Sequence, residues 1–249
     1  MGKLVGKVAL ITGGSGGIGL ATAKLFVTEG AHVYVTGRRQ GKVDEAVKEI
    51  GKDITGVQGD VANMADLDRL FKQIEQEKGK LDIVFANAGV AEYGPFGKVD
   101  EAQFDRLFDS NVKGMLFSVQ KALPLMPDGG AIVLTGSVVG SKGFPANTVY
   151  AATKAAIRSF ARTWTTDLKE RKIRVNVVSP SPTDTDGLRE AIKGNEAAQQ
   201  RIQSLVQTVP LGRLGRVEEI AKAVLFLVSD DSSFVTGAEL FADGGMGQV

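Results

Sequence analysis

The sequence has no cysteine and only one histidine, His32. The absence of cysteine excludes disulfide bonds, thiolate metal sites, iron–sulfur clusters and cysteine nucleophiles. A single histidine provides no cluster for zinc and argues against a Ser/His/Asp triad. We interpret His32, at the start of an expected strand, as structural or solvent-exposed. No metal site is therefore expected, and the usual hydrolase chemistries are disfavoured.

A strong charge imbalance and long hydrophobic runs are also missing. Lysine and arginine total 30 against 29 aspartate and glutamate, a formal net charge of +1, which gives no electrostatic reason to expect a nucleic-acid or anionic-membrane partner. The longest apolar runs, such as residues 223–228, are far shorter than the roughly 20 residues that span a bilayer. No long apolar segment ending in a cleavage site stands at the N-terminus. We expect a soluble, cytoplasmic protein whose partners must be identified from a local site.

Short β-branched runs alternate with longer helical patterns along the chain, and no linker, repeat or low-complexity tract interrupts them. Strands are expected near residues 7–12, 31–36, 54–58, 81–86, 130–135, 172–178 and 238–241, with helices near 17–29, 41–50, 64–78, 101–126, 148–170 and 217–228. This alternation predicts one α/β domain over residues 1–249, a Rossmann-like doubly wound parallel sheet of about seven strands with helices on both faces. Residues 181–210, where Pro and Thr precede a Gln-rich amphipathic stretch, are predicted to form a substrate lid.

Glycine is in excess, at 31 of 249 residues against a typical share of about 7%. Its densest run, Thr12 to Gly19, follows the first expected strand and precedes a helical pattern. Glycines allow positive φ and close backbone approach, and a helix N-terminus offers free N–H groups to an anion. The run predicts a pyrophosphate-binding turn, although its Gly-x-x-x-Gly-x-Gly spacing differs from the general Gly-x-Gly-x-x-Gly fingerprint. A glycine-rich turn without a ligand is the alternative.

That spacing, together with motifs further along the chain, resembles the classical short-chain dehydrogenase/reductase family from Lys7 to Gly245. The matching elements follow the family's order: Thr12 to Gly19, Asp60-Val61, Asn87-Ala88-Gly89, Asn111, Ser137, Tyr150-Ala151-Ala152-Thr153-Lys154 and Asn176 to Pro180. The resemblance implies a nicotinamide cofactor held by Gly13, Ser15, Gly17, Ile18, Gly19, Asp60, Val61, Asn87, Ala88, Gly89, Tyr150, Lys154, Pro180, Ser181, Thr183 and Thr185.

The end of the second expected strand bears on which nicotinamide cofactor is used. An acidic residue there would accept hydrogen bonds from the ribose 2′-hydroxyl of NAD, but this sequence has Gly37 followed by Arg38 and Arg39. Two guanidinium groups suit a 2′-phosphate, and Ser15 adds a hydroxyl. NADP(H) is therefore the expected cofactor, and solvated arginines at a strand end are the alternative.

Tyr150 and Lys154 are four residues apart, so they share one face of an expected helix. Ser137 lies thirteen residues before Tyr150 on a different element, and an adjacent ammonium is expected to favour the phenolate of Tyr150. In the family that the sequence resembles, Tyr150 gives a proton to a carbonyl oxygen and Ser137 positions that oxygen. Lys154 lowers the tyrosine pKa and holds the nicotinamide ribose, and Asn111 anchors a water. The alternative for a Tyr/Lys pair alone is an ordinary surface helix pair.

One position departs from the family pattern. Ser181 follows Pro180 where the family usually has Gly, and a side chain there is expected to strain the loop. This change affects substrate scope more than reaction type. The substrate pocket is expected to be mainly apolar, which fits a hydrophobic ketone better than a sugar, with walls from Glu92, Tyr93, Val138, Val139, Phe144, Asn147, Leu188, Leu205 and Val206.

The leading hypothesis is an NADP(H)-dependent enzyme that reduces a ketone or other carbonyl to a secondary alcohol reversibly. A 3-oxoacyl-[acyl-carrier-protein] reductase, with Arg158, Arg162 and Arg174 as candidate carrier contacts, and a glucose 1-dehydrogenase-like sugar dehydrogenase are alternatives. A nucleotide-sensing protein on the same fold is a further alternative, but it would not need the Tyr150 proton relay. Excess apolar residues in 101–126 and 148–170 predict a homo-tetramer, unless these helices only cover the sheet.

Overall fold

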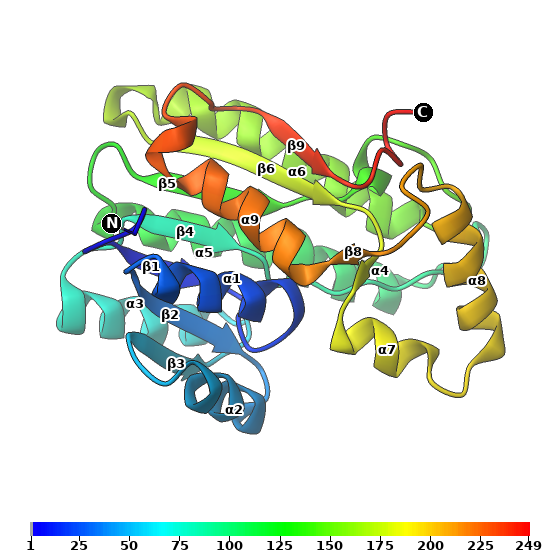
Figure 1. Ribbon diagram of the computed structural model, residues 1–249, viewed down its shortest axis with the longest axis horizontal. Helices are drawn as coiled ribbons and strands as arrows, with labels where there is room; N and C mark the ends of the chain where they lie inside the picture. Colours follow the sequence, from blue (N-terminus) through cyan, green and yellow to red (C-terminus); the bar gives the residue numbers. More distant parts are fainter. Residues whose placement is uncertain (1) are drawn as a thin grey trace.

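The computed structural model describes residues 2–249. Its main sheet contains seven parallel strands in the order β3-β2-β1-β4-β5-β6-β9 (Figure 1). The strands are β1 (Val8–Ile11), β2 (His32–Gly37), β3 (Ile54–Gln58), β4 (Ile83–Ala86), β5 (Ala131–Thr135), β6 (Arg174–Pro180) and β9 (Glu239–Ala242). The order reverses direction between β1 and β4, so the loops at their carboxyl ends diverge and leave a crevice where ligands bind in folds of this kind.

Helices cover both faces of the sheet, as predicted. The helices are α1 (Gly17–Thr28), α2 (Gln40–Ile50), α3 (Met64–Lys78), α4 (Glu101–Phe108), α5 (Gly114–Ala122), α6 (Thr148–Asp167) and α9 (Val217–Val228). One core cluster joins the sheet to α3, α5 and α6, and a second joins it to α1 and α9. In β1, Leu10 faces the first cluster and Ile11 the second, and both are fully buried. Strands buried on both faces explain the uninterrupted apolar runs in the sequence.

The helix predicted over 101–126 is divided in the structure. A π-helical turn at Asp109–Lys113 separates α4 from α5, and a short 3₁₀ turn at Leu123–Leu125 follows α5. The π-helical turn accommodates an extra residue, which shifts the register of α5 relative to α4. The apolar pattern on either side of the turn is helical, so the sequence alone gave no sign of it.

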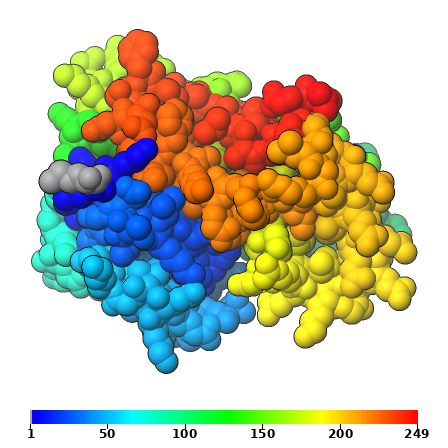
Figure 2. All heavy atoms as spheres, viewed as in Figure 1, coloured from blue at the N-terminus to red at the C-terminus, as the bar shows by residue number. Residues whose placement is uncertain are grey.

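Residues 181–210 form a separate lobe beside the carboxyl edge of the sheet. They contain β7 (Thr183–Asp184), α7 (Asp186–Ile192) and α8 (Glu196–Gln207), and β7 pairs in parallel with β8 (Gly215–Arg216). Figure 2 shows a hollow between this lobe, in yellow, and the N-terminal part of the chain, in blue. Across residues 2–249, no helix has the length and apolar character needed to cross a membrane.

Candidate active site

The glycine-rich loop between β1 and α1 is tied to the end of β4. The Thr12 hydroxyl accepts hydrogen bonds from the backbone N–H groups of Asn87 and Ala88, both at 3.0 Å. The Asn87 side-chain amide donates to the carbonyl oxygens of Thr12 (3.1 Å) and Gly13 (3.3 Å). Thr12 is a functional position that the sequence reasoning did not assign. Its only signal was its place directly before the glycine run.

Close packing inside this loop requires glycine. Gly13 has a φ of +65°, and a Cβ at Gly19 would lie 2.3 Å from the Gly13 carbonyl oxygen. The first residue of α1, Gly17, also has a positive φ, and no side chain caps the helix N-terminus. The first backbone N–H groups of α1 therefore lie beside a loop without side chains that would block an anion. This arrangement fits the pyrophosphate of a dinucleotide.

A cavity of about 290 Å³ opens beside the glycine-rich loop at the carboxyl edge of the sheet. The structure brings nine of the predicted cofactor residues to its walls: Gly13, Ser15, Gly37, Arg38, Arg39, Asp60, Val61, Ala88 and Gly89. Thr36, Gly59, Val90 and Ser110 also line it and were not predicted. They adjoin the predicted residues in chain or space but carry no distinctive motif. Its position and lining fit the adenosine half of a dinucleotide.

Of the charged groups that line this cavity, the Asp60 carboxylate is hydrogen-bonded within the protein, whereas the two arginines are exposed. The Asp60 carboxylate accepts a hydrogen bond from the Ala62 N–H (3.0 Å), while its own N–H donates to Asp66 (2.9 Å). These bonds order the loop after β3. Arg38 and Arg39 are exposed, and within residues 2–249 neither guanidinium forms an ion pair. Both are therefore available to an anionic ligand.

Ser137, Tyr150 and Lys154 come together at the carboxyl end of β5. Tyr150 and Lys154 share one face of α6, and the Lys154 Nζ lies 5.6 Å from the centre of the Tyr150 ring. The Lys154 Nζ donates a 2.8 Å hydrogen bond to the carbonyl oxygen of Thr135. Ser137, two residues after β5, is within hydrogen-bonding reach of the Tyr150 phenol. A phenol, a hydroxyl and an ammonium group are thus assembled at one point.

Burial dominates the acid–base properties of this group. It raises the pKa of Tyr150 above its usual value, and the Ser137 hydrogen bond opposes the shift only in part. Burial also lowers the pKa of Lys154 to about 8. The pKa shift of Tyr150 is thus opposite to the expected one, because desolvation of the phenol and the nearby Tyr93 outweigh the hydrogen bond of Ser137. In this structure the phenol is protonated at neutral pH.

Asn111 lies within the π-helical turn and is fully buried. Its oxygen accepts a hydrogen bond from the Val90 N–H (2.8 Å), and its amide nitrogen donates to the Val90 carbonyl (2.9 Å) and to the Thr153 hydroxyl (3.2 Å). The Thr153 hydroxyl in turn donates to the backbone carbonyl of Tyr150 (2.7 Å). Asn111 therefore links the loop after β4 to the helix that carries Tyr150 and Lys154.

The loop after β6 departs from the expectation of strain. The non-glycine residues with positive φ among residues 2–249 are Asp53, Ala146 and Lys172. Ser181 is not one of them, so a side chain is compatible with its backbone. The Thr183 hydroxyl donates to the Ser181 carbonyl (2.9 Å), and Thr185 caps α7 by accepting the Leu188 N–H (3.1 Å). The two threonines therefore order the start of the lobe.

The predicted substrate residues fall into two groups. Four of them pack in one apolar cluster with three residues that were not predicted, Val209, Phe241 and Met246; the four are Val138, Val139, Phe144 and Leu205. The C-terminal segment thus contributes to this wall, although its residues follow no recognisable motif. The other predicted residues are Glu92 and Tyr93 on the loop after β4, Asn147 before α6, Leu188 on α7 and Val206 on α8. The Asn147 amide is buried and donates to the Pro145 carbonyl (2.8 Å).

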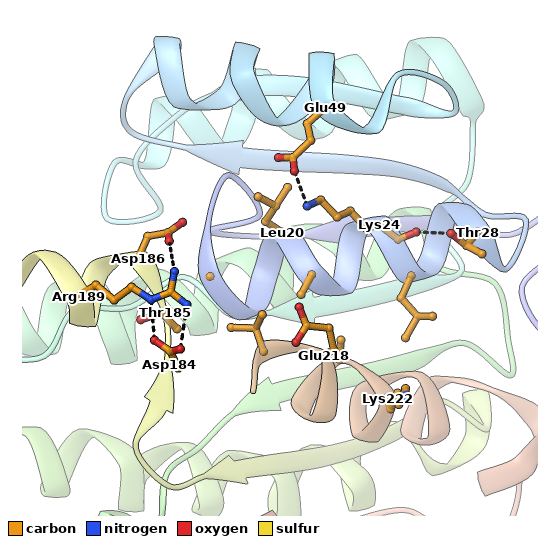
Figure 3. A pocket seen from close by; sticks show the side chains of 15 residues that line it. Leu20, Lys24, Thr28, Glu49, Asp184, Thr185, Asp186, Arg189, Glu218 and Lys222 are labelled. Carbon is orange, nitrogen blue, oxygen red and sulfur yellow. Dashed lines mark hydrogen bonds and ion pairs between the residues drawn. The ribbon is translucent and has the colours of Figure 1, made fainter. Parts of the chain in front are cut away.

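Another cavity, of about 510 Å³, lies between α1, α9 and the start of α7 (Figure 3). Ion pairs at its rim join Lys24 to Glu49 (2.6 Å) and Arg189 to Asp184 (2.8 Å). The predicted cofactor residues Gly17 and Thr185 line this cavity instead of the nucleotide cavity. None of the four predicted catalytic side chains lines it, so it is separate from the candidate reacting centre.

Comparisons with known proteins agree with this geometry. The model of a family described as enoyl-(acyl carrier protein) reductase matches residues 13–247. Oxidoreductase asL5 of Sarocladium schorii is 46% identical over 249 residues, which is 99% of this chain and 98% of that protein. A solved short chain dehydrogenase/reductase family protein superimposes with a TM-score of 0.89 at 38% identity, covering 99% of this chain and all of that chain (100%). A blue fluorescent protein from a metagenomic library, in complex with NADPH, has a TM-score of 0.90 at 35% identity and covers 98% of this chain and 99% of its own.

Proposed function

The chain belongs to the classical short-chain dehydrogenase/reductase family, and on this basis we propose that it is an NADP(H)-dependent carbonyl reductase. Members of this family bind a nicotinamide cofactor. The proposed reaction converts a ketone to a secondary alcohol and is reversible. The observation that carries the proposal is the assembly of the Tyr150 phenol, the Ser137 hydroxyl and the Lys154 ammonium at the carboxyl end of β5.

The dinucleotide would be held along the carboxyl edge of β1, β2, β3 and β4. The glycine-rich loop and the N-terminus of α1 would bind the pyrophosphate, and Asp60 and Val61 would contact the adenine. Arg38, Arg39 and Ser15 would bind a 2′-phosphate, and Gly37 provides no carboxylate to repel it. The solved relative in complex with NADPH supports this choice of cofactor.

When bound, the nicotinamide supplies the hydride, and the protein supplies position and a proton. Ser137 would donate a hydrogen bond to the substrate carbonyl oxygen and hold it beside the Tyr150 phenol. A tyrosine phenol is protonated at neutral pH, so Tyr150 can give its proton to that oxygen as negative charge develops there. Because a raised pKa makes the phenol a weaker acid, the proton transfer depends on neighbouring groups that stabilise the phenolate.

Lys154 and Asn111 would support this proton transfer. A Lys154 ammonium next to the Tyr150 ring stabilises the phenolate that remains after the proton has left. Its hydrogen bond to Thr135 fixes its position, from which it would also contact the nicotinamide ribose. Asn111 would act as a positioning residue through Thr153, in addition to anchoring a water near Lys154.

The lobe at residues 181–210 would act as the substrate lid, and the enzyme would assemble as a homo-tetramer. Two aromatic pairs on neighbouring helices support the assembly: Phe104 stacks on Phe108 (4.4 Å between centres), and Phe160 stacks on Trp164 (4.8 Å). Phe104 is 45% exposed. Further contact with a second copy would remove this apolar surface from water.

A second candidate is a 3-oxoacyl-[acyl-carrier-protein] reductase, favoured by the description of the matching family. Its carrier contacts would need exposed basic residues. Arg158 pairs with Glu239 (3.3 Å), and Arg174 is half-buried and donates to carbonyl oxygens such as that of Leu227 (2.7 Å). Of the three predicted arginines, only Arg162 is exposed. This arrangement gives little support to carrier docking at these positions.

Initial rates distinguish these functions. The panel contains aryl ketones, ketoesters, an acetoacetyl thioester and glucose, each tested with NADPH, NADH or the oxidised cofactors. We expect NADPH-dependent reduction of ketones or ketoesters, and Tyr150→Phe serves as the control for active-site chemistry. Preference for the thioester would favour the carrier-protein reductase, and oxidation of glucose alone would favour the sugar dehydrogenase. Cofactor binding without turnover of any substrate would favour a nucleotide sensor.

A further inference from the structure

An arginine of the lobe, Arg201, contacts an aromatic ring that itself packs against Tyr150. Arg201 lies on α8, and its guanidinium carbon is 3.9 Å from the centre of the Tyr93 ring. The Tyr93 ring makes an edge contact with the Tyr150 ring, with 5.9 Å between centres and 80° between planes. These two distances limit the separation of the guanidinium carbon from the Tyr150 ring centre to about 10 Å. Residues 108 positions apart in the sequence are thus brought together at one site.

The residues on either side of Tyr93 fix its place. Glu92 makes two hydrogen bonds with the Arg106 guanidinium, at 3.0 and 2.9 Å. The N–H of Gly94 donates to the carbonyl oxygen of Ala146 (3.0 Å), just before α6. Tyr93 is nevertheless 50% exposed. The loop therefore presents a half-exposed aromatic face beside Tyr150, and Arg201 occupies that face.

Arg201 differs from neighbouring arginines in having no carboxylate partner. Arg106, Arg189 and Arg213 each make two-pronged contacts with a carboxylate. Arg201 is half-buried, and no ion pair joins it to any acidic group within residues 2–249. The Glu92 carboxylate next to Tyr93 is already engaged by Arg106. A guanidinium over an aromatic ring is held less strongly than one paired with a carboxylate, so a carboxylate in the substrate would compete for it.

We propose that Arg201 binds a carboxylate of the substrate and thereby directs the enzyme to oxo acids. This inference rests on the carbonyl reductase function proposed above. The ketone oxygen would lie at Ser137 and Tyr150, and the carboxylate would lie at Arg201. The Arg201 guanidinium carbon and the Tyr150 ring centre are at most about 10 Å apart, so a substrate that contacts both side chains would have only a few methylene groups between its ketone and its carboxylate. The apolar wall formed by Val138, Val139, Phe144 and Leu205 would contact that chain.

The test compares 4-oxopentanoate, 5-oxohexanoate and 6-oxoheptanoate with their methyl esters, using NADPH. Each pair has the same ketone and differs in one negative charge. We expect the wild-type enzyme to have a higher kcat/KM for at least one acid than for its ester. Arg201→Gln should lower that acid-to-ester ratio about tenfold or more, mainly through a higher KM for the acid. Arg201→Lys should restore part of the ratio.

Lys193→Gln is the matched control, because it removes one positive charge from an exposed position between α7 and α8. This variant should leave the ratio unchanged. Added salt should reduce the wild-type ratio but not that of Arg201→Gln, because only the wild type has the ionic contact to screen. Thermal unfolding of each variant checks that α8 remains folded.

Two results would overturn the inference. If Arg201→Gln lowers the rates with acids and esters equally, Arg201 only holds α8 over Tyr93 and does not select substrates. The same conclusion follows if the wild-type enzyme shows no preference for any acid. In both cases reduction of the esters would leave the carbonyl reductase function intact. Failure to reduce every acid and every ester would overturn that function and this inference with it.

Discussion

Removal of the Arg38 guanidinium is expected to reduce the use of NADPH while leaving the use of NADH nearly unchanged. Arg38 lines the nucleotide cavity and forms no ion pair within residues 2–249, and the Gln58 amide holds its backbone carbonyl at 3.0 Å. A 2′-phosphate carries between one and two negative charges at neutral pH. A charge-assisted hydrogen bond to it contributes about 1.5–3 kcal/mol, which corresponds to roughly a 10- to 150-fold change in affinity.

We therefore expect Arg38→Ala to raise the KM for NADPH at least tenfold and to change that for NADH much less. Steady-state kinetics with both cofactors at a fixed ketone concentration measure the difference. Arg39→Ala is the comparison variant. A smaller effect is expected from it, because Arg39 is the cap residue of α2 and Arg38 remains in that variant to contact the phosphate. The reasoning is refuted if the wild-type enzyme uses NADH with a kcat/KM equal to or above that for NADPH.

The converse substitution places a carboxylate at the end of β2. Gly37→Asp would repel a 2′-phosphate and accept hydrogen bonds from free ribose hydroxyls. However, a Cβ at Gly37 would lie 2.3 Å from the Ser15 hydroxyl oxygen. The single variant must displace that hydroxyl, so it is expected to bind both cofactors less well. Ser15→Ala/Gly37→Asp removes the closest contact and should favour NADH, with Ser15→Ala alone as the control.

The other predictions concern the reacting centre and the assembly. Tyr150→Phe should lower kcat about 100-fold or more while leaving the NADPH Kd within a few-fold in a fluorescence titration; more than a tenth of wild-type activity would contradict the assignment. Lys154→Ala should impair both activity and cofactor affinity, and equal cofactor Kd values would disprove the ribose contact. Lys154 has a pKa of about 8 in the folded protein and 10.5 in the unfolded chain. Between these two pH values its side chain is protonated mainly in the unfolded chain, so the free energy of unfolding of the wild type without cofactor should rise with pH across this range. At pH 7, Lys154→Met should therefore be more stable than the wild type by about 2 kcal/mol, a figure that already subtracts the lost hydrogen bond to Thr135. Urea denaturation should show this difference shrinking toward pH 10. Light scattering should give a tetramer mass at micromolar concentration; a monomer mass would exclude that assembly.

Much of the fold follows from local sequence pattern. The predicted strands match the observed ones to within a few residues, because buried parallel strands have continuous apolar runs and are separated by helical periodicity. The periodicity did not reveal the π-helical turn at Asp109–Lys113, since one extra residue leaves the pattern on each side intact. It also did not define α7 and α8 within the predicted lid, where no buried stripe marks their bounds.

The candidate site was less predictable than the fold for a physical reason. Motifs identified Ser137, Tyr150 and Lys154, but the sign of the Tyr150 pKa shift depends on how far the ring is removed from water. The contact between Arg201 and Tyr93 is similarly hidden, because it joins two elements that are distant in the chain. Ser181 is not strained, because its φ is not positive. The residue type alone could not show this, since the sequence does not give the φ angle of a loop residue.

The π-helical turn makes the length of the chain at this point as important as its composition. Deleting one residue from Asp109–Lys113 would allow α4 and α5 to join as one regular helix, which would gain continuous i to i−4 hydrogen bonds. Met115 and Val119 anchor α5 in the core. Loss of one residue would therefore rotate α4 relative to α5 by about 100° and would move Asn111. A single-residue deletion would thus produce a more regular helix and a misaligned Tyr150. Natural sequences with this reacting centre are therefore expected to tolerate substitutions in the turn, except at Asn111, far better than changes in its length.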